Sequence, residues 1–154
     1  MFSEMRIYRI ENYFYKKKLN FLAKVFYKLN YYLHNSHISA SIEMGGCSFA
    51  YGGIGMVIHH NAKIGNNCMI GQGVTIGGKV GSSKTPVIGN NVYIGAGVRI
   101  LGNISIGDNC VIAPNSVIVK DVEAYSVMAG VPAKKINTIT KDNIEKFKGY
   151  GIKK

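Results

Sequence analysis

The hydrophobic positions in the middle of the chain recur every six residues. Isoleucine occupies nine positions in one phase, namely Ile64, Ile70, Ile76, Ile88, Ile94, Ile100, Ile106, Ile112 and Ile118. Gly often follows the isoleucine, and the residue two before it is often small or medium-sized. A period of six matches neither the 3.6-residue repeat of a helix nor a long alternating strand. It predicts short strands joined by corners, three to a coil, with the isoleucines of successive coils stacked in the core.

Two insertions interrupt this rhythm. Residues 77–87 separate two consecutive isoleucines of the repeat, and their Gly, Ser, Lys and Pro content is that of a protruding loop. Upstream, the segment between Phe49 and Ile58 is also longer than one repeat and contains Tyr51-Gly52-Gly53-Ile54-Gly55. Insertions in a solenoid project from one face, which is often the binding face.

The two ends of the chain differ from its middle. We predict a basic, aromatic-rich helical lead-in at residues 1–35, a β-helix at 36–136 and a basic tail with a short helix at 137–154. The lead-in carries a stripe with helical spacing, formed by Leu19, Leu22, Phe26, Leu29 and Leu33. This stripe has two interpretations that the sequence leaves open. It either caps the first coil, as solenoids require, or lies on an anionic membrane surface.

Charge and composition exclude several classes of protein. The net charge of +11 is concentrated in the two ends, whereas a duplex-binding protein usually carries its charge on the folded reading face. We therefore expect no nucleic-acid partner. The chain has no apolar run of about 20 residues, no secretory signal and an odd number of cysteines, so we expect a cytoplasmic protein. Cys68 and Cys110 occupy the small-residue position and should pack in the core, Cys47 is unassigned, and no metal site is expected.

Three segments resemble the hexapeptide-repeat acyltransferases. They are IHHNAKIGNNCMIGQGVTIGG at residues 58–78, the run from PVIGNN to VKDV at 86–122, and AGVPAK at 129–134. The likeness is greatest to serine O-acetyltransferases and to their relatives in bacterial capsule and lipopolysaccharide gene clusters. This resemblance implies a left-handed parallel β-helix and a homotrimer. It also implies that acetyl-CoA, the acetyl donor, binds in the cleft between neighbouring subunits.

The chain departs from serine acetyltransferases at the positions of their functional residues. Their Asp-His pair matches Tyr51 and Gly52, and their second functional His matches Thr85. These differences favour a branch that acetylates a sugar hydroxyl of a surface polysaccharide or its precursor. Acetylation of L-serine in cysteine synthesis is the alternative. A non-catalytic trimeric scaffold is a second alternative.

Acetyl transfer to a hydroxyl needs a base, and His is the side chain whose pKa suits that role at neutral pH. The two histidines of the lead-in, His34 and His37, are expected to be solvated. His59 occupies the corner position where most repeats have Gly, so its imidazole must point away from the coil. We predict His59 as the general base, with His60 as the second candidate. No nucleophile with an adjacent base is evident, which favours direct transfer, with the Gly77-Gly78 corner as oxyanion donor.

The family resemblance also implies the contacts to acetyl-CoA. It places Ala96 and Gly97 near the pantetheine arm and Pro114 in the next coil. The residues that it assigns to the nucleotide and its phosphates are Val119, Lys120 and Lys134. Lysine suits a mobile phosphate because it acts as a point charge.

Overall fold

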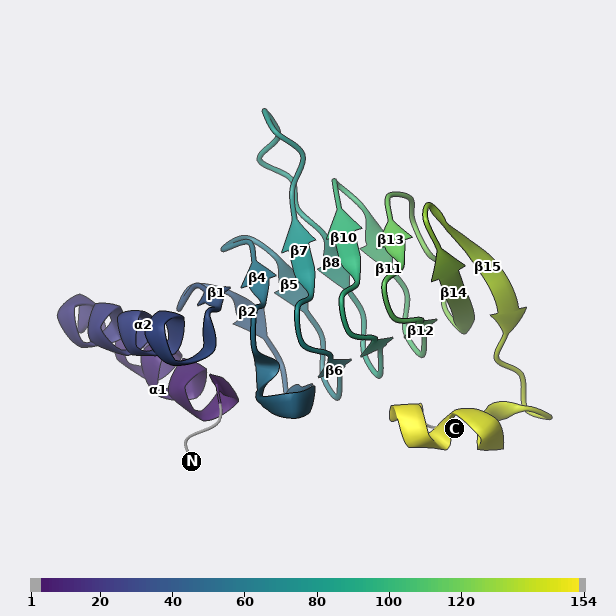
Figure 1. The fold of residues 1–154 in the computed structure, drawn as a ribbon, viewed down its shortest axis with the longest axis horizontal. Coiled ribbons are helices and arrows are strands. Elements are labelled where there is room, and N and C mark those ends of the chain that lie inside the picture. Colours follow the sequence, from purple (N-terminus) through teal and green to yellow (C-terminus); the bar gives the residue numbers. More distant parts are fainter. Residues whose placement is uncertain (1–3, 153–154) are drawn as a thin grey trace.

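The computed structural model describes residues 4–152, which form a three-sided parallel β-helix with two α-helices at one end (Figure 1). Sheet A contains β1 (His37–Ile38), β4 (Val57–Ile58), β7 (Thr75–Gly77), β10 (Arg99–Leu101) and β13 (Val117–Ile118). Sheet B contains β2 (Glu43–Met44), β5 (Lys63–Ile64), β8 (Val87–Ile88) and β11 (Ser105–Ile106). Sheet C contains β3 (Ser48–Phe49), β6 (Met69–Ile70), β9 (Tyr93–Ile94), β12 (Val111–Ile112), β14 (Ser126–Gly130) and β15 (Ala133–Thr138).

The strands of successive coils pair in parallel and in register, so each isoleucine lies over the isoleucine of the next coil. Ile58 pairs with Ile76, and Ile76 pairs with Ile100. Among the described strands, only the last pair, β14 with β15, is antiparallel. The prediction of a left-handed parallel β-helix is confirmed.

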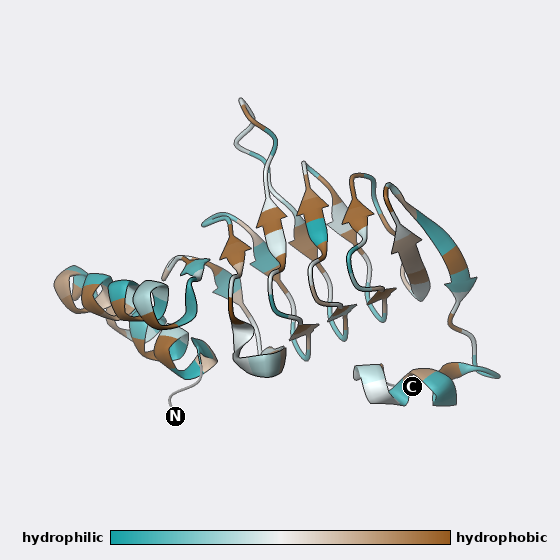
Figure 2. Ribbon diagram, in the orientation of Figure 1, coloured by the Kyte–Doolittle hydropathy of each residue, from teal (hydrophilic) through white to brown (hydrophobic). Residues whose placement is uncertain are grey.

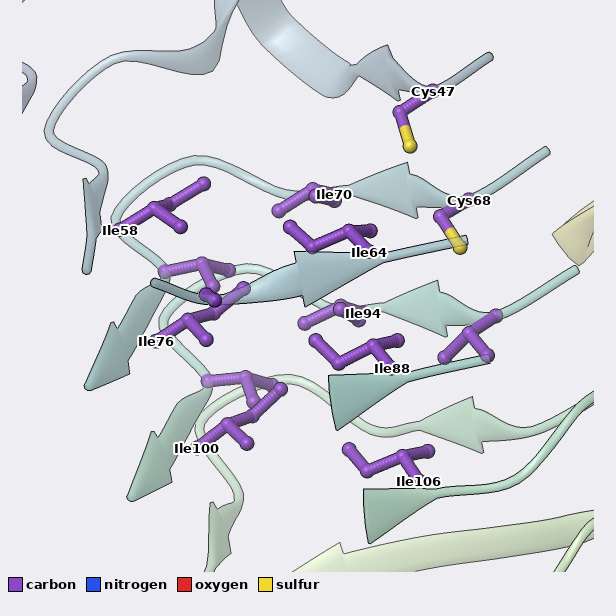
Figure 3. Close-up of a cluster of buried hydrophobic side chains, with 14 of the residues drawn as sticks. Cys47, Ile58, Ile64, Cys68, Ile70, Ile76, Ile88, Ile94, Ile100 and Ile106 are labelled. Atoms are coloured by element: carbon purple, nitrogen blue, oxygen red, sulfur yellow. The ribbon is translucent and has the colours of Figure 1, made fainter. Parts of the chain in front are cut away.

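The core consists of columns of stacked isoleucines (Figure 3). Ile58, Ile76 and Ile100 form one column, and Ile64, Ile88 and Ile106 form another. These side chains are buried. Burying each one contributes about 1.5–3 kcal/mol before the entropy of ordering is subtracted. The six-residue period therefore marks one inward-pointing side chain per strand.

All three cysteines are buried free thiols. Each thiol donates a hydrogen bond of 3.2 Å to a backbone carbonyl of the next coil, from Cys47 to Gly65, from Cys68 to Gly89 and from Cys110 to Glu123. The predicted packing of Cys68 and Cys110 is confirmed. Cys47, which the sequence left unassigned, has the same role in the coil before that of Cys68 (Figure 3).

The corners from sheet B to sheet C and from sheet C to sheet A turn through residues with positive φ. Between sheets B and C these residues include Asn67, Asn91 and Asn109. Between sheets C and A the equivalent residues are Gly55, Gly73, Gly97 and Asn115, a row that we call the C–A edge. Backbone N–H groups join neighbouring corners, as from Gly97 to the Gln72 carbonyl at 2.9 Å. The Gly and Asn residues at these corners thus relieve the backbone where the coil changes direction.

Gly95 tests how closely the coils pack at this edge. A Cβ atom at Gly95 would lie 2.6 Å from the backbone nitrogen of Pro114 in the next coil. We expect Gly95→Ala to lower the free energy of unfolding by about 1–3 kcal/mol, because the coils must separate. Gly46→Ala is the control, since a Cβ there meets no atom within 4 Å. Urea unfolding of both variants measures the difference, and equal stability would contradict the close approach.

The lead-in forms two antiparallel helices, α1 (Glu4–Lys16) and α2 (Asn20–His34). Met5 and Tyr8 of α1 join the core, and the Tyr8 hydroxyl donates to the Ile42 carbonyl at 2.9 Å. The helical pair therefore caps the first coil. No helix within residues 4–152 is long and apolar enough to cross a bilayer.

The packed face of α2 is not the predicted stripe. Its buried residues are Ala23, Asn30 and His34, whereas four of the five stripe residues are exposed, namely Leu19, Leu22, Leu29 and Leu33. Figure 2 shows hydrophobic colour recurring along this helix. The expectation of a solvated His34 is also wrong, because the ring is buried and its Nδ1 lies 3.0 Å from the Asn30 Oδ1. His37, by contrast, is exposed.

The C-terminal tail folds back on the β-helix. A short 3₁₀ helix, η2 (Ile144–Tyr150), lies beside sheet C. Ile144 and Ile152 pack with Val111 and Val127 of that sheet. The tail therefore covers the outer face of sheet C. The short helix that the sequence predicts is confirmed, although β15 extends to Thr138, two residues beyond the predicted end of the β-helix.

Candidate active site

The predicted base and the predicted oxyanion corner lie one above the other where sheet A turns into sheet B. Because Ile58 pairs with Ile76, the next residues, His59 and Gly77, occupy neighbouring coils. The His59 N–H donates to the Ile76 carbonyl at 2.8 Å. Gly77 in turn pairs with Leu101 of the following coil. We call this row of corners the A–B edge.

The two histidines at this edge form a stacked pair. Their ring centroids are 4.2 Å apart with an interplanar angle of 26°. Burial, with a smaller contribution from the neighbouring charge of His60, lowers the pKa of His59 below its ordinary value. The backbone N–H of Asn61 donates to the His59 Nδ1 at 3.2 Å. A neutral His59 that accepts this bond carries its proton on Nε2 and has no free lone pair there.

His60 lines two grooves that meet at the A–B edge. One, which we call the loop groove, has a volume of about 430 Å³ and is also lined by Lys63, Lys84 and Thr85. The other, which we call the helix groove, has a volume of about 540 Å³ and lies between the helices and the first coil. His59 lines neither groove. Of the two rings, that of His60 is therefore the one open to a ligand in either groove.

The predicted loop at residues 77–87 projects from the β-helix between β7 and β8 (Figure 1). Val80 at its tip is fully exposed. Its return to the coil is anchored by Thr85, which is buried and whose hydroxyl donates to the Asn61 carbonyl at 2.9 Å. The bond connects the loop to the residue that follows the histidine pair.

The C–A edge consists mainly of glycine corners that stack on one another. A Cβ at Gly73 would lie 4.0 Å from the Gly97 Cα, so the two corners stack without side chains between them. The Arg99 guanidinium donates to the carbonyls of Gly73 and Gly97 and holds these corners together. Sequence reasoning missed Arg99. Its position, two residues after the Gly corner and pointing outward from sheet A, was the available signal.

One subunit does not bring all the predicted site residues together. The A–B edge carries His59, His60, Gly77, Gly78, Val119 and Lys120. The C–A edge carries Ala96, Gly97 and Pro114. Lys134 belongs to β15, opposite Ala129 of β14, and is exposed. The two edges border opposite sides of sheet A.

The insertion before Ile58 forms a short turn, η1 (Ala50–Gly53), at the beginning of the C–A edge. Tyr51 is 84% exposed there and has a φ of 53°. Gly53 is buried, and a Cβ at this position would collide with the Glu4 carboxylate of α1. Within residues 4–152, no three His, Cys, Asp or Glu side chains are grouped as a metal site.

Comparison with known proteins shows which family this chain resembles. Residues 85–120 match the family of bacterial transferase hexapeptide repeats. The serine acetyltransferase of Helicobacter pylori strain J99 is 34% identical over 137 residues, which are 88% of this chain and 78% of the relative. Curated serine acetyltransferases of Bacillus species are longer, and the chain spans 59–60% of their length.

Solved structures give the same result. A serine acetyltransferase from Neisseria gonorrhoeae in complex with serine has a TM-score of 0.78 and 36% identity, over 85% of this chain and 54% of that one. A serine acetyltransferase from Brucella abortus in complex with coenzyme A has a TM-score of 0.82 and 32% identity, over 88% of this chain and 55% of that one.

These relatives correct the prediction drawn from the three altered positions. The expected placement in a capsule or lipopolysaccharide branch, with a sugar hydroxyl as acceptor, is wrong, because the curated relatives are named serine acetyltransferases. Substitutions at Tyr51, Gly52 and Thr85 are local, and they count for less than a likeness that extends over most of the chain. The chain belongs to the serine acetyltransferase family of hexapeptide-repeat transferases.

Proposed function

We propose that this protein is an acetyl-CoA-dependent O-acetyltransferase with L-serine as its acceptor. The observation that carries this proposal is the likeness of residues across 85% of the chain to a serine acetyltransferase solved with serine. The likeness to a structure solved with coenzyme A supports the choice of donor. The chain spans about half of each of these proteins, so the activity calls for a direct assay of this chain.

The reaction is a direct transfer. The acceptor hydroxyl loses its proton to an imidazole while its oxygen attacks the thioester carbonyl of acetyl-CoA. The tetrahedral intermediate then collapses, the carbon–sulfur bond breaks, and the CoA thiolate leaves and takes up the proton. Backbone N–H groups at the Gly77-Gly78 corner would stabilise the oxyanion, which is the largest single contribution in many acyl transfers.

We assign the base to the histidine pair, and within it to His60. His60 lines both grooves, whereas the His59 Nδ1 accepts the Asn61 N–H. A base must offer a free lone pair toward the hydroxyl. His59 would then position His60 by stacking, at a centroid distance of 4.2 Å.

The donor is assigned to the C–A edge and the end of the β-helix. Ala96, Gly97 and Pro114 are small or compact residues at this edge, along which a pantetheine arm would extend. Among the described residues Lys134 forms no ion pair, while its neighbour Lys135 pairs with Glu123 at 3.2 Å. Lys120 and Lys134 are exposed and suit the phosphates of the nucleotide, with Val119 beside them.

The active assembly is proposed to be a homotrimer, because the base and the donor surface lie on different edges of one subunit. A cyclic trimer joins the A–B edge of one chain to the C–A edge of its neighbour through a head-to-tail interface. Light scattering should give three times the chain mass of 16.8 kDa.

Mixing two inactive variants tests the shared site. When His60→Ala and Ala96→Trp chains are co-expressed in equal amounts, about a third of the sites in mixed trimers, and about a quarter of all sites, combine two intact edges. Activity should therefore return in the mixture. A fully active monomer, or no recovery from well-folded mixed trimers, would contradict the shared site.

Release of CoA thiol from acetyl-CoA tests the activity itself. We expect L-serine to accelerate thiol release, and mass spectrometry to identify O-acetylserine as the product. Glycine, which has the amine and carboxylate of serine and no hydroxyl, is the control acceptor. Equal rates with glycine and serine would indicate simple thioester hydrolysis and overturn the proposal.

We also infer a peripheral contact with anionic membranes through α2. Phe21 and Tyr32 of this helix are 78% and 76% exposed, and Lys24 and Lys28 lie on the same helix. Each lysine near an anionic surface contributes about 1 kcal/mol of attraction that salt screens. The chain should sediment with phosphatidylserine vesicles at low salt and be released at high salt. Failure to sediment at low salt would end this assignment.

A further inference from the structure

The turn η1 exposes an aromatic side chain that has no partner in its own subunit. Within residues 4–152, the Tyr51 side chain forms no hydrogen bond and no ring contact, and it is 84% exposed. Its φ of 53° and ψ of 32° lie in the left-handed region, which favours Gly or Asn over a bulky residue. A tyrosine in this conformation therefore costs the isolated subunit stability and returns no contact to it.

The backbone on either side of Tyr51 is fixed by buried groups. The Ser36 hydroxyl donates to the Gly53 carbonyl at 3.0 Å, and the Gly55 N–H donates to the His34 carbonyl at 2.9 Å. Ser36, Gly53 and His34 are buried. The turn is thus held by the first coil and by α2, while the ring that it carries stays in solvent. A rigidly presented tyrosine is suited to contact another chain, because little conformational entropy is lost on binding.

The turn and the histidine pair belong to the same coil. The C–A corner with Tyr51 precedes β4, and the A–B corner with His59 and His60 follows it (Figure 1). Rotation about a three-fold axis parallel to the β-helix keeps each coil at its own height. In the proposed trimer, the Tyr51 corner of one subunit therefore lies at the level of the His60 corner of its neighbour.

The loop groove beside His60 lacks a partner for an ammonium group. Lys84 lines this groove without an ion pair among the described residues, so it can hold a carboxylate. Glu43, the acidic residue of the groove, is already paired with Lys63 at 3.0 Å. An amino acid bound there needs a cation-binding group from outside the subunit. The face of an aromatic ring is such a group.

We propose that Tyr51 of one subunit completes the acceptor site of its neighbour, with its ring against the ammonium group of serine bound beside His60. This assignment rests on the proposed serine acetylation and on the proposed trimer. It makes Tyr51 a specificity residue that acts across the subunit boundary. Loss of the ring should raise KM for serine more than it lowers kcat.

Calorimetric titration of the full chain with L-serine, without acetyl-CoA, tests the ring independently of catalysis. We expect Tyr51→Asn to weaken serine binding about tenfold, the effect of losing one contact between an ammonium group and a ring. Its melting temperature should be equal or higher, because Asn tolerates the left-handed region. Tyr51→Phe restores the ring and should restore most of the affinity. Equal serine affinity in Tyr51→Asn and the wild type would overturn the assignment.

Tyr125→Asn is the matched control. Tyr125 also has a positive φ, of 60°, and is 43% exposed, but it lies at the last corner between sheets B and C. This variant should bind serine as the wild type does. 3-Hydroxypropionate, which lacks the amine, should compete with serine equally well in Tyr51→Asn and the wild type. A weaker competition in Tyr51→Asn would refute the contact with the ammonium group.

Mixed trimers show which subunit supplies the ring. His60→Ala and Tyr51→Asn chains are co-expressed and assayed at a serine concentration well below KM, where each chain alone is impaired. Some sites then join an intact His60 to the intact Tyr51 of the neighbouring chain, so the rate should exceed the mean of the two parents. A ring that acted within its own subunit would create no such site. A rate equal to the mean would therefore refute the contribution from the neighbour.

Cross-linking tests the contact between subunits without catalysis. A chain with both Tyr51→Cys and His60→Cys should form covalent trimers with a short bismaleimide, whereas neither single variant should. The native cysteines are buried, and the wild type measures their background. Cross-linked trimers whose serine binding depends on the ring, in a protein that transfers no acetyl group, would retain this inference and refute the activity. Serine acetylation without cross-linking, and with an unchanged KM in Tyr51→Asn, would retain the activity and refute this inference.

Discussion

A His60→Ala variant is expected to lose about 10²–10⁴-fold in kcat for acetyl transfer, the usual contribution of a positioned general base. The affinity for acetyl-CoA should stay nearly unchanged, because the contacts proposed for the pantetheine arm and the phosphates do not involve this ring. The loss should be partly rescued at alkaline pH, where hydroxide takes the proton that the imidazole would have accepted. Steady-state kinetics and an independent CoA titration give these two quantities.

His59→Ala is the matched comparison within the pair. It removes the ring that stacks on His60 at 4.2 Å, while the ring that lines both grooves remains. We therefore expect a smaller loss in kcat than for His60→Ala. The reverse order would return the role of base to His59. Full activity of both variants would place the base elsewhere.

The stability of the protein should fall as the pH rises from about 5 to about 8. Burial raises the pKa of Glu4 to about 8, an effect that the Ser36 hydroxyl offsets only partly. Burial likewise raises the pKa of Glu11 to about 8 against a hydrogen bond from Ala40. Between the ordinary carboxyl pKa and 8, the folded chain holds protons that the unfolded chain has released. The free energy of unfolding is therefore highest below this pH window. Within the window it decreases by about 1.4 kcal/mol per pH unit for each group.

Glu4→Gln isolates one of these groups. The amide cannot ionise, so the variant should be more stable than the wild type at pH 8.5 and should show a weaker pH dependence. Glu123→Gln, at an exposed carboxylate, should follow the wild type at every pH. Urea unfolding at pH 5.5, 7 and 8.5 measures the three chains. A wild-type stability that is flat or rising across this range would contradict the burial of protonated carboxyls.

The sequence was a good guide to the β-helix because the six-residue period reports directly on geometry. Each strand has one inward side chain and one relaxed corner, so the sequence pattern repeats with each strand. Ile76 and Ile100 belong to this repeat, which can be recognised before any contact is known. The protruding loop was found for the same reason, since an insertion breaks the period. Cys68 and Cys110 were placed in the core because they share a phase with other small residues.

The lead-in shows why the helical stripe failed as a guide. An apolar stripe indicates the buried face of a helix when most of its partner surface is apolar. In α2 the buried positions are Ala23, Asn30 and His34, and the leucines face outward. The face of α2 that packs depends on its contact with α1, whose Met5 and Tyr8 join the core. No pattern within α2 contains that information.

For the candidate site, too, the sequence predicted one part and the tertiary structure decided the other. The sequence alone pointed to His59 and His60, because a His at a corner where other repeats have Gly has no role in packing. Which ring is open to a ligand depends on the Asn61 N–H and on grooves lined by distant residues, so only the tertiary structure could favour His60. The acceptor was misassigned because three altered positions are local, whereas family likeness is a property of the whole chain.

The amino-acid sequence by itself therefore determined the β-helix, its corners, its loop and its helical lead-in, because these depend on a short-range repeat. The tertiary structure alone decided which groups share an edge and which are removed from water. Glu11 is an ordinary helical glutamate in the sequence. It becomes a buried carboxylate with an unpartnered oxygen only because α1, α2 and the first coil enclose it together. Burial depends on every element packed around a residue, and so it leaves no mark in the local sequence.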